Sequence, residues 1–173
     1  MTLRQEWLIR PGTRYDFTVL QQMIYEALYW QPDAEREPFD FVIAHHEIAR
    51  YVDDFGRQGD CAVIAEVGTN QEGIGAAWYR LFSEDAPGYG FVSESVPEVA
   101  MAVAAPFRGM GVGRAMLEAL IDLARRDDVP SLSLSVEIAN TRALRLYENL
   151  GFVPVAGDEH NHTMLLDLTS SPS

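Results

Sequence analysis

The chain has 173 residues, of which 47% are hydrophobic, and a net charge of −13 at pH 7. This length and composition predict one domain with a substantial core, and the acidic balance argues against nucleic acid as a ligand, because phosphate binding needs a basic face. No run of 18 or more apolar residues occurs and residues 1–7 lack the apolar stretch of a signal peptide, so we expect no membrane contact and a cytoplasmic protein.

The first half of the chain predicts a strand, two helices and two further strands. Apolar residues recur with a helical period in two segments, and alternating or continuous apolar runs bounded by turn residues mark the strands. In chain order these are a strand over 7–10, helices over 16–29 and 41–55, and strands over 62–67 and 74–82. A loop with glycine, proline and acidic residues follows over 83–95.

The second half alternates strands and helices. We expect a strand over 99–104, a helix from residue 112, a strand over 132–136, a helix over 140–150 and final strands over 152–155 and 164–168. The order of elements predicts an α+β or mixed α/β domain. That domain is expected to span residues 1–169, with a polar tail over 170–173.

The most informative segment is residues 103–114, V-A-A-P-F-R-G-M-G-V-G-R. An apolar strand ends at Pro106, an arginine and three alternating glycines follow, and an amphipathic helix begins. Backbone N–H groups and the positive end of a helix dipole therefore converge on one point, which suits a phosphate or pyrophosphate. A tight strand-to-helix turn without a ligand is the alternative interpretation.

Two common phosphate loops are excluded by the residues themselves. A Walker A loop ends in G-K-[ST], and this chain has no lysine, since its 13 basic residues are all arginine. A dinucleotide-binding loop needs G-x-G-x-x-G, but Gly109 and Gly111 are followed three positions on by Arg114.

Residues 108–113 match R-G-x-G-x-G/A, and here the chain resembles the GNAT superfamily of N-acetyltransferases at its acyl-coenzyme A pyrophosphate loop. A second block, from Asn140 to Phe152, resembles the downstream motif N-x-x-A-x-x-[LF]-Y-x-x-x-G-F of that family. The two motifs stand in the same order as in the family, and the close resemblance covers residues 95–156. It implies a central, mostly antiparallel, partly mixed, twisted sheet flanked by about four helices, with acetyl-CoA as co-substrate and no metal.

The resemblance places acetyl-CoA on the strand and loop that end in the glycines. The glycines leave backbone amides open to phosphate oxygens, two arginines can add charge, and the strand can pair with the amide-rich pantetheine arm as an added strand would. The residues concerned are Met101, Ala102, Val103, Arg108, Gly109, Met110, Gly111, Val112, Gly113 and Arg114.

Asn140 and Tyr147 are seven residues apart, so a helix presents them on one face. By the resemblance, Asn140 bonds the pantetheine arm and Tyr147 protonates the departing thiolate. A phenol with a reference pKa of about 10 can protonate a thiolate whose conjugate acid has a pKa of about 8.5 at a modest penalty. A plain helix N-cap at Asn140 and a core aromatic at Tyr147 are the alternatives.

Glu98 is the candidate general base. An alkylammonium has a pKa of about 10.4 and cannot attack a thioester until it is deprotonated. Glu98 stands at the start of the strand that ends at the glycine loop, on the same side as Ala100 and Ala102, and in many relatives a glutamate near this position draws the proton through water. Glu94 is the reserve candidate, and a solvated strand-end carboxylate is the alternative.

The acceptor is expected to meet aromatic side chains outside the two motifs. Candidate substrate-binding residues are Tyr29, Trp30, Trp78 and Tyr89, although core or loop packing explains them equally well. Residues 26–98 hold 15 acidic residues and four arginines, a net charge of −11. This acidity either lines an approach for a cationic amine or serves solubility.

The histidines and the one cysteine predict no metal site. His45 and His46 are adjacent in a predicted helix, where side chains point about 100° apart, and His160 and His162 flank a turn. No cysteine or carboxylate spacing completes a zinc set with either pair. Cys61 lies in an apolar run and is interpreted as a small buried hydrophobe.

Together these features predict an N-acetyltransferase that transfers an acetyl group from acetyl-CoA to a primary amine by direct attack in a ternary complex. The single cysteine lies outside both motifs, so no carrier for an acyl-enzyme is evident. The amine is expected on a small molecule such as a polyamine, an amino acid or an aminoglycoside-like compound. A protein amine and a non-catalytic acyl-coenzyme A sensor are the alternatives, and a homodimer is possible.

Overall fold

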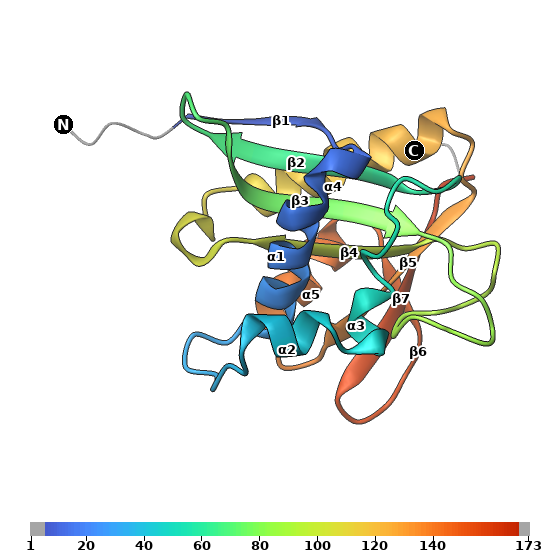
Figure 1. Cartoon of the computed structure of the whole chain (residues 1–173). Helices are drawn as coiled ribbons and strands as arrows, with labels where there is room; N and C mark the ends of the chain where they lie inside the picture. The colour runs from blue at the N-terminus through green and yellow to red at the C-terminus, as the bar shows by residue number, and fades with distance from the viewer. Residues whose placement is uncertain (1–5, 170–173) are drawn as a thin grey trace.

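The computed structural model describes residues 6–169, which form one seven-stranded sheet with helices on both faces (Figure 1). The strands are β1 (Trp7–Pro11), β2 (Cys61–Val67), β3 (Glu72–Arg80), β4 (Glu98–Val103), β5 (Ser131–Glu137), β6 (Val153–Gly157) and β7 (Asn161–Asp167). The tail expected over 170–173 lies outside the described residues, so a single domain over 1–169 remains a proposal.

The strand order is β1-β2-β3-β4-β5-β7-β6. Within the described sheet every neighbouring pair is antiparallel except β4 and β5, which are parallel. The mostly antiparallel, partly mixed sheet is therefore confirmed. A parallel pair needs a crossover connection, and the helix that follows the glycine loop supplies it.

The described residues also form five α-helices and two short 3₁₀ turns. These are α1 (Phe17–Leu28), α2 (Phe39–Ile43), α3 (His46–Ala49), α4 (Val112–Arg126), α5 (Thr141–Asn149), η1 (Arg14–Asp16) and η2 (Ala105–Phe107). Helices α1 to α3 cover one face of the sheet, and α4 and α5 cover the other (Figure 1). The sheet thus separates two buried hydrophobic clusters, and the cluster under α4 is the larger.

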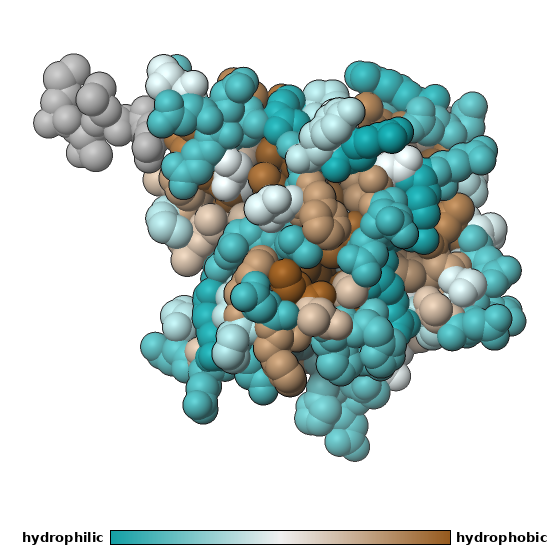
Figure 2. Space-filling model, viewed as in Figure 1, coloured by the Kyte–Doolittle hydropathy of each residue, from teal (hydrophilic) through white to brown (hydrophobic). Residues whose placement is uncertain are grey.

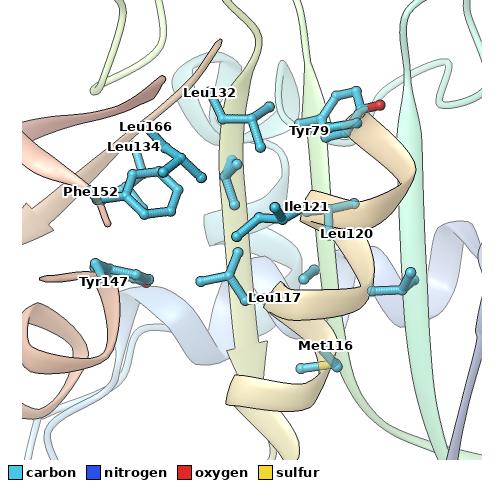
Figure 3. Packing of buried hydrophobic residues seen from close by; sticks show 14 of the residues in the cluster. Tyr79, Met116, Leu117, Leu120, Ile121, Leu132, Leu134, Tyr147, Phe152 and Leu166 are labelled. Atoms are coloured by element: carbon cyan, nitrogen blue, oxygen red, sulfur yellow. The ribbon is translucent and has the colours of Figure 1, made fainter. Parts of the chain in front are cut away.

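Helix α4 buries one continuous apolar stripe against the sheet (Figure 3). Met116, Leu117, Leu120, Ile121 and Ala124 recur with the helical period and are all buried. Each large side chain in such a stripe contributes about 1.5–3 kcal/mol through burial. This packing fixes the start of α4, and with it the glycine loop, against the end of β4.

The predicted helix over 41–55 is wrong in its extent. The chain forms only the short helices α2 and α3, because His45 adopts an extended conformation with φ −69° and ψ 123° between them. Residues after α3 continue as turns rather than as a helix. The apolar residues of this segment still face the core at Ile48, Tyr51, Val52 and Phe55.

Side chains of β3 explain why the helix stops. The guanidinium of Arg80 donates to the backbone carbonyls of Arg50 (2.8 Å) and Asp53 (2.9 Å), and the indole N–H of Trp78 donates to the carbonyl of Tyr51 (2.9 Å). A continued helix would need these carbonyls for its own N–H groups. The turn that carries Tyr51 is therefore fixed to the sheet.

Figure 2 shows hydrophilic residues over most of the face that α1 to α3 cover, with hydrophobic residues gathered near its centre, where α1 and α2 lie. Within residues 6–169, no helix is long and apolar enough to cross a membrane.

Candidate active site

A cavity of about 920 Å³ lies between β4 and β5. Its walls come from α1, the glycine loop, β4, β5, the start of α5 and the turn between β6 and β7. It therefore gathers residues from both sequence motifs and from the segment between β3 and β4. A volume of this size is typical of ligand sites.

The cavity exists because β4 and β5 pair only at their beginnings. Their register has a single pair, Glu98 with Ser133, and the Ser133 N–H donates to the Pro97 carbonyl (3.0 Å). Beyond that pair, residues of both strands line the cavity instead of bonding each other. The edge of β4 that faces β5 is consequently free to bond a ligand.

The glycine loop forms one end of the cavity. Gly109 and Gly111 have positive φ values of 82° and 85°, a conformation that favours glycine, and Gly111 is the N-cap of α4. A Cβ at Gly111 would meet no atom within 4 Å, so its open side faces empty space in front of the helix N-terminus. Because Gly111 also lines the cavity, the N-terminus of α4 opens into the cavity, which is the arrangement of an anion-binding helix N-terminus.

The two loop arginines that we expected to add charge have protein partners. Arg108 donates to the carbonyls of Val103 (2.9 Å) and Trp30 (3.0 Å) and to the carboxylate of Glu26 (3.1 Å). Arg114 pairs with Glu118 one turn along α4 at 2.8 Å. Both line the cavity, but Arg108 chiefly ties the loop to the end of α1.

Arg142 is the cation that the sequence argument missed. It lies in the first turn of α5, lines the cavity, and has no hydrogen bond or ion pair with any described residue. A Cβ at Gly109 would come within 2.6 Å of its Nη2 atom, so its guanidinium lies against the glycine loop. Its position two residues after Asn140 in the second motif was the only available signal.

Glu98 lies at the other end of the cavity and is only 2% exposed. Its Oε1 accepts hydrogen bonds from the Tyr51 hydroxyl (2.6 Å) and the Gly90 N–H (2.9 Å), and its Oε2 is buried without a partner among the described residues. Burial raises the pKa of Glu98 to about 7, although both hydrogen bonds oppose that rise. The solvated carboxylate that was the alternative is excluded.

Tyr147 lies at the edge of the larger cluster, next to Phe152 with 5.9 Å between ring centroids (Figure 3). It lines the cavity, and its hydroxyl has no hydrogen-bond partner among residues 6–169. Burial raises the pKa of Tyr147 to about 12. The phenol therefore stays protonated at neutral pH and can donate a hydrogen bond into the cavity.

Asn140 is the N-cap of α5, since its side-chain oxygen accepts from the Ala143 N–H at 3.2 Å. It also lines the cavity. Because the cap uses only the oxygen, the amide NH₂ remains as a donor, and the two roles considered for this residue are compatible.

Of the remaining predicted cofactor residues, four line the cavity and two do not. Met101, Ala102, Val103 and Gly113 line the cavity. Met110 is 59% exposed and Val112 is buried in the core, and neither lines it. Only their backbone amides remain as groups that a ligand in the loop could contact.

The four aromatic residues expected at the acceptor site do not come together. Trp30 and Tyr89 line the cavity, whereas Tyr29 accepts a hydrogen bond from the Glu37 N–H outside it. Trp78 is fully buried and bonds the Tyr51 carbonyl, so it leaves no face for a substrate. For Trp78 the packing interpretation is correct, because β3 is covered on both faces.

No group of three or more metal-ligating side chains occurs among the described residues. His45 and His46 stack with 5.1 Å between ring centroids instead of diverging, because His45 precedes α3 and is not helical. Cys61 is half-buried at the start of β2, and burial raises the pKa of its thiol.

Two solved structures illustrate the likeness in fold. A putative acetyltransferase from Salmonella typhimurium, solved with acetyl-CoA, aligns over 97% of this chain and 97% of its own, with a TM-score of 0.67 and 22% identity. The ribosomal-protein-alanine N-acetyltransferase from Brucella melitensis aligns over 92% of this chain and 99% of its own, with a TM-score of 0.66 and 23% identity. At these identities the likeness defines the fold alone.

The sequence model of the acetyltransferase (GNAT) family matches residues 22–152, which include both motifs. The chain therefore belongs to the acetyltransferase (GNAT) family.

Two curated relatives show how far the likeness extends. Mycothiol acetyltransferase from Jonesia denitrificans is 28% identical over 131 residues, which is 75% of this chain and 37% of that protein. The ribosomal protein bS18 alanine N-acetyltransferase of Escherichia coli is 44% identical over 52 residues, which is 30% of this chain and 35% of that protein. The chain thus matches well under half the length of these relatives.

Proposed function

We propose that the protein transfers the acetyl group of acetyl-CoA to a primary amine on a small molecule, by direct attack in a ternary complex. The observation that carries this proposal is the single cavity that joins the glycine loop to Glu98 and Tyr147. An anion cradle, a proton acceptor and a proton donor along one cavity are the groups that such a transfer requires.

The residues at the loop end suit coenzyme A. The open space at Gly111 and the N-terminus of α4 would hold the pyrophosphate, with Arg142 beside it. The free edge of β4 and the amide of Asn140 would bond the amides of the pantetheine arm. Bound in this way, acetyl-CoA supplies the reactive thioester.

Glu98 would accept a proton from the ammonium form of the substrate. A carboxyl group with a pKa of about 7 is half ionised at neutral pH and matches the working range of a general base. The neutral amine then forms a bond to the acetyl carbon as the carbon–sulfur bond breaks. Overall, the ammonium substrate and acetyl-CoA give the acetamide, free coenzyme A thiol and one proton.

Tyr147 would donate to the sulfur as it leaves. Its pKa of about 12 lies above that of a free thiol, about 8.5, so a hydrogen bond to the developing thiolate is favoured over complete early transfer. The nitrogen loses its first proton to Glu98 and a second one as the amide forms. That second loss balances the proton that the sulfur gains.

Charges along the cavity support a cationic acceptor. At the loop end Arg108 and Arg114 are paired with Glu26 and Glu118, which leaves Arg142 as the cation without an ion pair among residues 6–169. Glu137 and Asp158 line the part formed by β5 and the β6–β7 turn. Glu137 has no ion pair with any described residue. Opposite charges at the two ends would direct an anionic donor and a cationic acceptor to different places.

Variants of the two catalytic candidates test their roles. Tyr147→Phe and Glu98→Gln should each lower kcat by about 10²-fold or more, while the Kd of coenzyme A stays within about twofold. Tyr79→Phe is the matched control, because Tyr79 is a buried tyrosine outside the cavity. Kinetics would use the best amine from a panel of polyamines, amino acids, aminoglycosides and short peptides with free N-termini.

The outcomes separate the alternatives. A preference for the peptides would indicate a protein amine as the acceptor. Tight binding of coenzyme A without amine-dependent release of thiol would indicate a sensor module and overturn the enzymatic proposal.

A further inference from the structure

We propose that Tyr51 is a positioning residue for Glu98. Its hydroxyl and the Gly90 N–H both donate hydrogen bonds to Oε1 of Glu98, so the proton from the substrate amine binds at the other oxygen, Oε2. This inference rests on the proposed function. Tyr51 lies in the turn after α3, outside both sequence motifs, and Gly90 lies in the segment between β3 and β4.

The direction of the hydrogen bonds at Tyr51 is fixed by its other partner. The Tyr89 N–H donates to the Tyr51 oxygen at 2.7 Å, and an N–H group can only donate. The hydroxyl proton of Tyr51 is therefore free to point at Glu98, 2.6 Å away. Tyr51 acts as a donor to the carboxylate and stabilises its ionised form.

Oε1 is consequently saturated while Oε2 is not. Oε1 accepts from Tyr51 and from the Gly90 N–H, and Oε2 has no donor within residues 6–169. A buried oxygen without a donor is unfavourable by about 1–3 kcal/mol. A proton that reaches Glu98 therefore binds at Oε2, where it displaces no existing hydrogen bond.

Two glycines allow the segment to lie this close to the carboxylate. A Cβ at Gly88 would overlap Oε2 of Glu98 and come within 2.8 Å of the Tyr51 hydroxyl, and a Cβ at Gly90 would overlap the backbone of Leu134. Both glycines have ordinary negative φ values, so close approach and not backbone conformation requires them. In the sequence, this contact corresponds to the two glycines of G-Y-G at 88–90.

The turn that carries Tyr51 is held rigidly from β3. The Trp78 indole N–H donates to the Tyr51 carbonyl (2.9 Å), and the fully buried Arg80 bonds the carbonyls of Arg50 and Asp53 on either side. Trp78, a predicted substrate-binding residue, therefore holds the backbone of Tyr51 instead.

The titratable and charged groups around Glu98 set the expected direction of a pKa change. Arg50 and Tyr51 belong to the turn after α3, and Tyr89 belongs to the segment before β4. Arg80 lies on β3, and its guanidinium is paired with Asp60 at 2.7 Å. Tyr51 and Arg50 lower the pKa of Glu98. Removing the Tyr51 hydroxyl should therefore raise that pKa.

The test compares Tyr51→Phe with the wild type and with Tyr79→Phe, a buried tyrosine outside the cavity. The pKa of Glu98 is measured in the protein without ligand by carbon NMR of labelled glutamate carboxyls, with Glu98→Gln to assign the signal. In parallel, kcat/KM is measured against pH. We expect Tyr51→Phe to raise the pKa by about one unit and to move the acidic limb of kcat/KM upward by the same amount.

An unchanged pKa in folded Tyr51→Phe overturns the inference, because a merely structural tyrosine would lower activity equally at every pH. A raised pKa with an unmoved acidic limb supports the positioning role and overturns the base assignment in the proposed function. The two failures are therefore distinguishable.

Gly88→Ala tests the same arrangement with Tyr51 still present, should Tyr51→Phe not fold, because its Cβ would crowd both Oε2 of Glu98 and the Tyr51 hydroxyl. Its methyl group would occupy the space beside Oε2, so kcat should fall at least tenfold while the Kd of coenzyme A is kept. Retained kcat in this variant overturns the inference, and Gly12→Ala, where a Cβ would also press on another residue, Ala62, controls for crowding.

Discussion

Burial of the Glu98 carboxyl makes the stability of the protein depend on pH. Its pKa rises from the usual 4.5 to about 7 on folding, so the folded state holds the proton more tightly than the unfolded state between these values. Folding stability therefore falls as pH rises through this window. The ionised carboxylate destabilises the fold at the pH where the proposed reaction needs it.

Glu98→Gln should remove this dependence, since glutamine stays neutral. Between pH 5 and 8 the stability of the variant relative to the wild type should rise by about 2.5 kcal/mol, at 1.36 kcal/mol per pKa unit. Urea unfolding of both proteins at the two pH values measures the difference. A difference that does not change with pH would contradict the raised pKa.

Arg142 should contribute to binding of coenzyme A through its charge. Arg142→Ala should weaken binding about tenfold, which corresponds to about 1.4 kcal/mol, a moderate value for an exposed charged hydrogen bond. Arg145→Ala is the matched control, because Arg145 is exposed on the same helix but does not line the cavity. Equal effects in calorimetry would refute a specific contact, as would a loss that higher salt leaves unchanged.

At this scale the sequence predicted residues for which a motif or a neighbouring strand gave a local pattern. Glu98, Asn140 and Tyr147 line one cavity as expected. Tyr51 was missed, because its contact with Glu98 spans 47 residues of sequence. No local pattern reports a contact of that range.

At the scale of elements, two variants can separate the effect of backbone strain in the glycine loop from the effect of that loop on ligand binding. Gly111→Glu adds a strained residue at φ 85° and places a carboxylate in the anion cradle. Gly68→Glu adds the same residue at φ 72° in the β2–β3 turn, where a Cβ is equally unobstructed. Each should cost about 1–2 kcal/mol of stability through strain.

Only Gly111→Glu should abolish binding of coenzyme A, because of like-charge repulsion and filled space, with a rise in Kd of at least 100-fold. Isothermal calorimetry at one salt concentration compares the two. If Gly111→Glu binds as well as Gly68→Glu, the pyrophosphate does not lie in this loop.

The elements were predictable where local periodicity and packing agreed. Helix α4 begins at the expected residue, and strands β2 to β5 begin and end within about two residues of the expected bounds. The segment after α3 departs because Arg80 and Trp78, more than 20 residues away, bind its carbonyls. Apolar spacing alone could not distinguish a helix from turns that bury the same residues.

On the scale of the whole molecule, one topological feature produces the site. A sheet that is antiparallel except at β4 and β5 opens between these strands after a single pair, and the two motifs meet across the opening. The order of elements in the sequence predicted the fold class. It could not predict where the two strands separate, since that depends on how α1, α4 and α5 pack on the two faces.

A few of the charged residues of this acidic chain line the cavity, and the two signs are unevenly placed along it. Arginines lie at the loop end, and carboxylates lie at the end near β7. Of the acidic stretch over 26–98, only Glu26 and Glu98 line the cavity, and Glu26 is paired with Arg36 and Arg108. Glu137 and Asp158 belong to the less acidic part of the chain.

The most direct test of the central claim is the dependence of thiol release on an amine. With acetyl-CoA and the amine panel, the wild-type protein should release one coenzyme A thiol for each acetylated amine found by mass spectrometry, at a rate that saturates with both substrates. Thiol release that is independent of every amine, or tight binding of coenzyme A without release, would contradict the account.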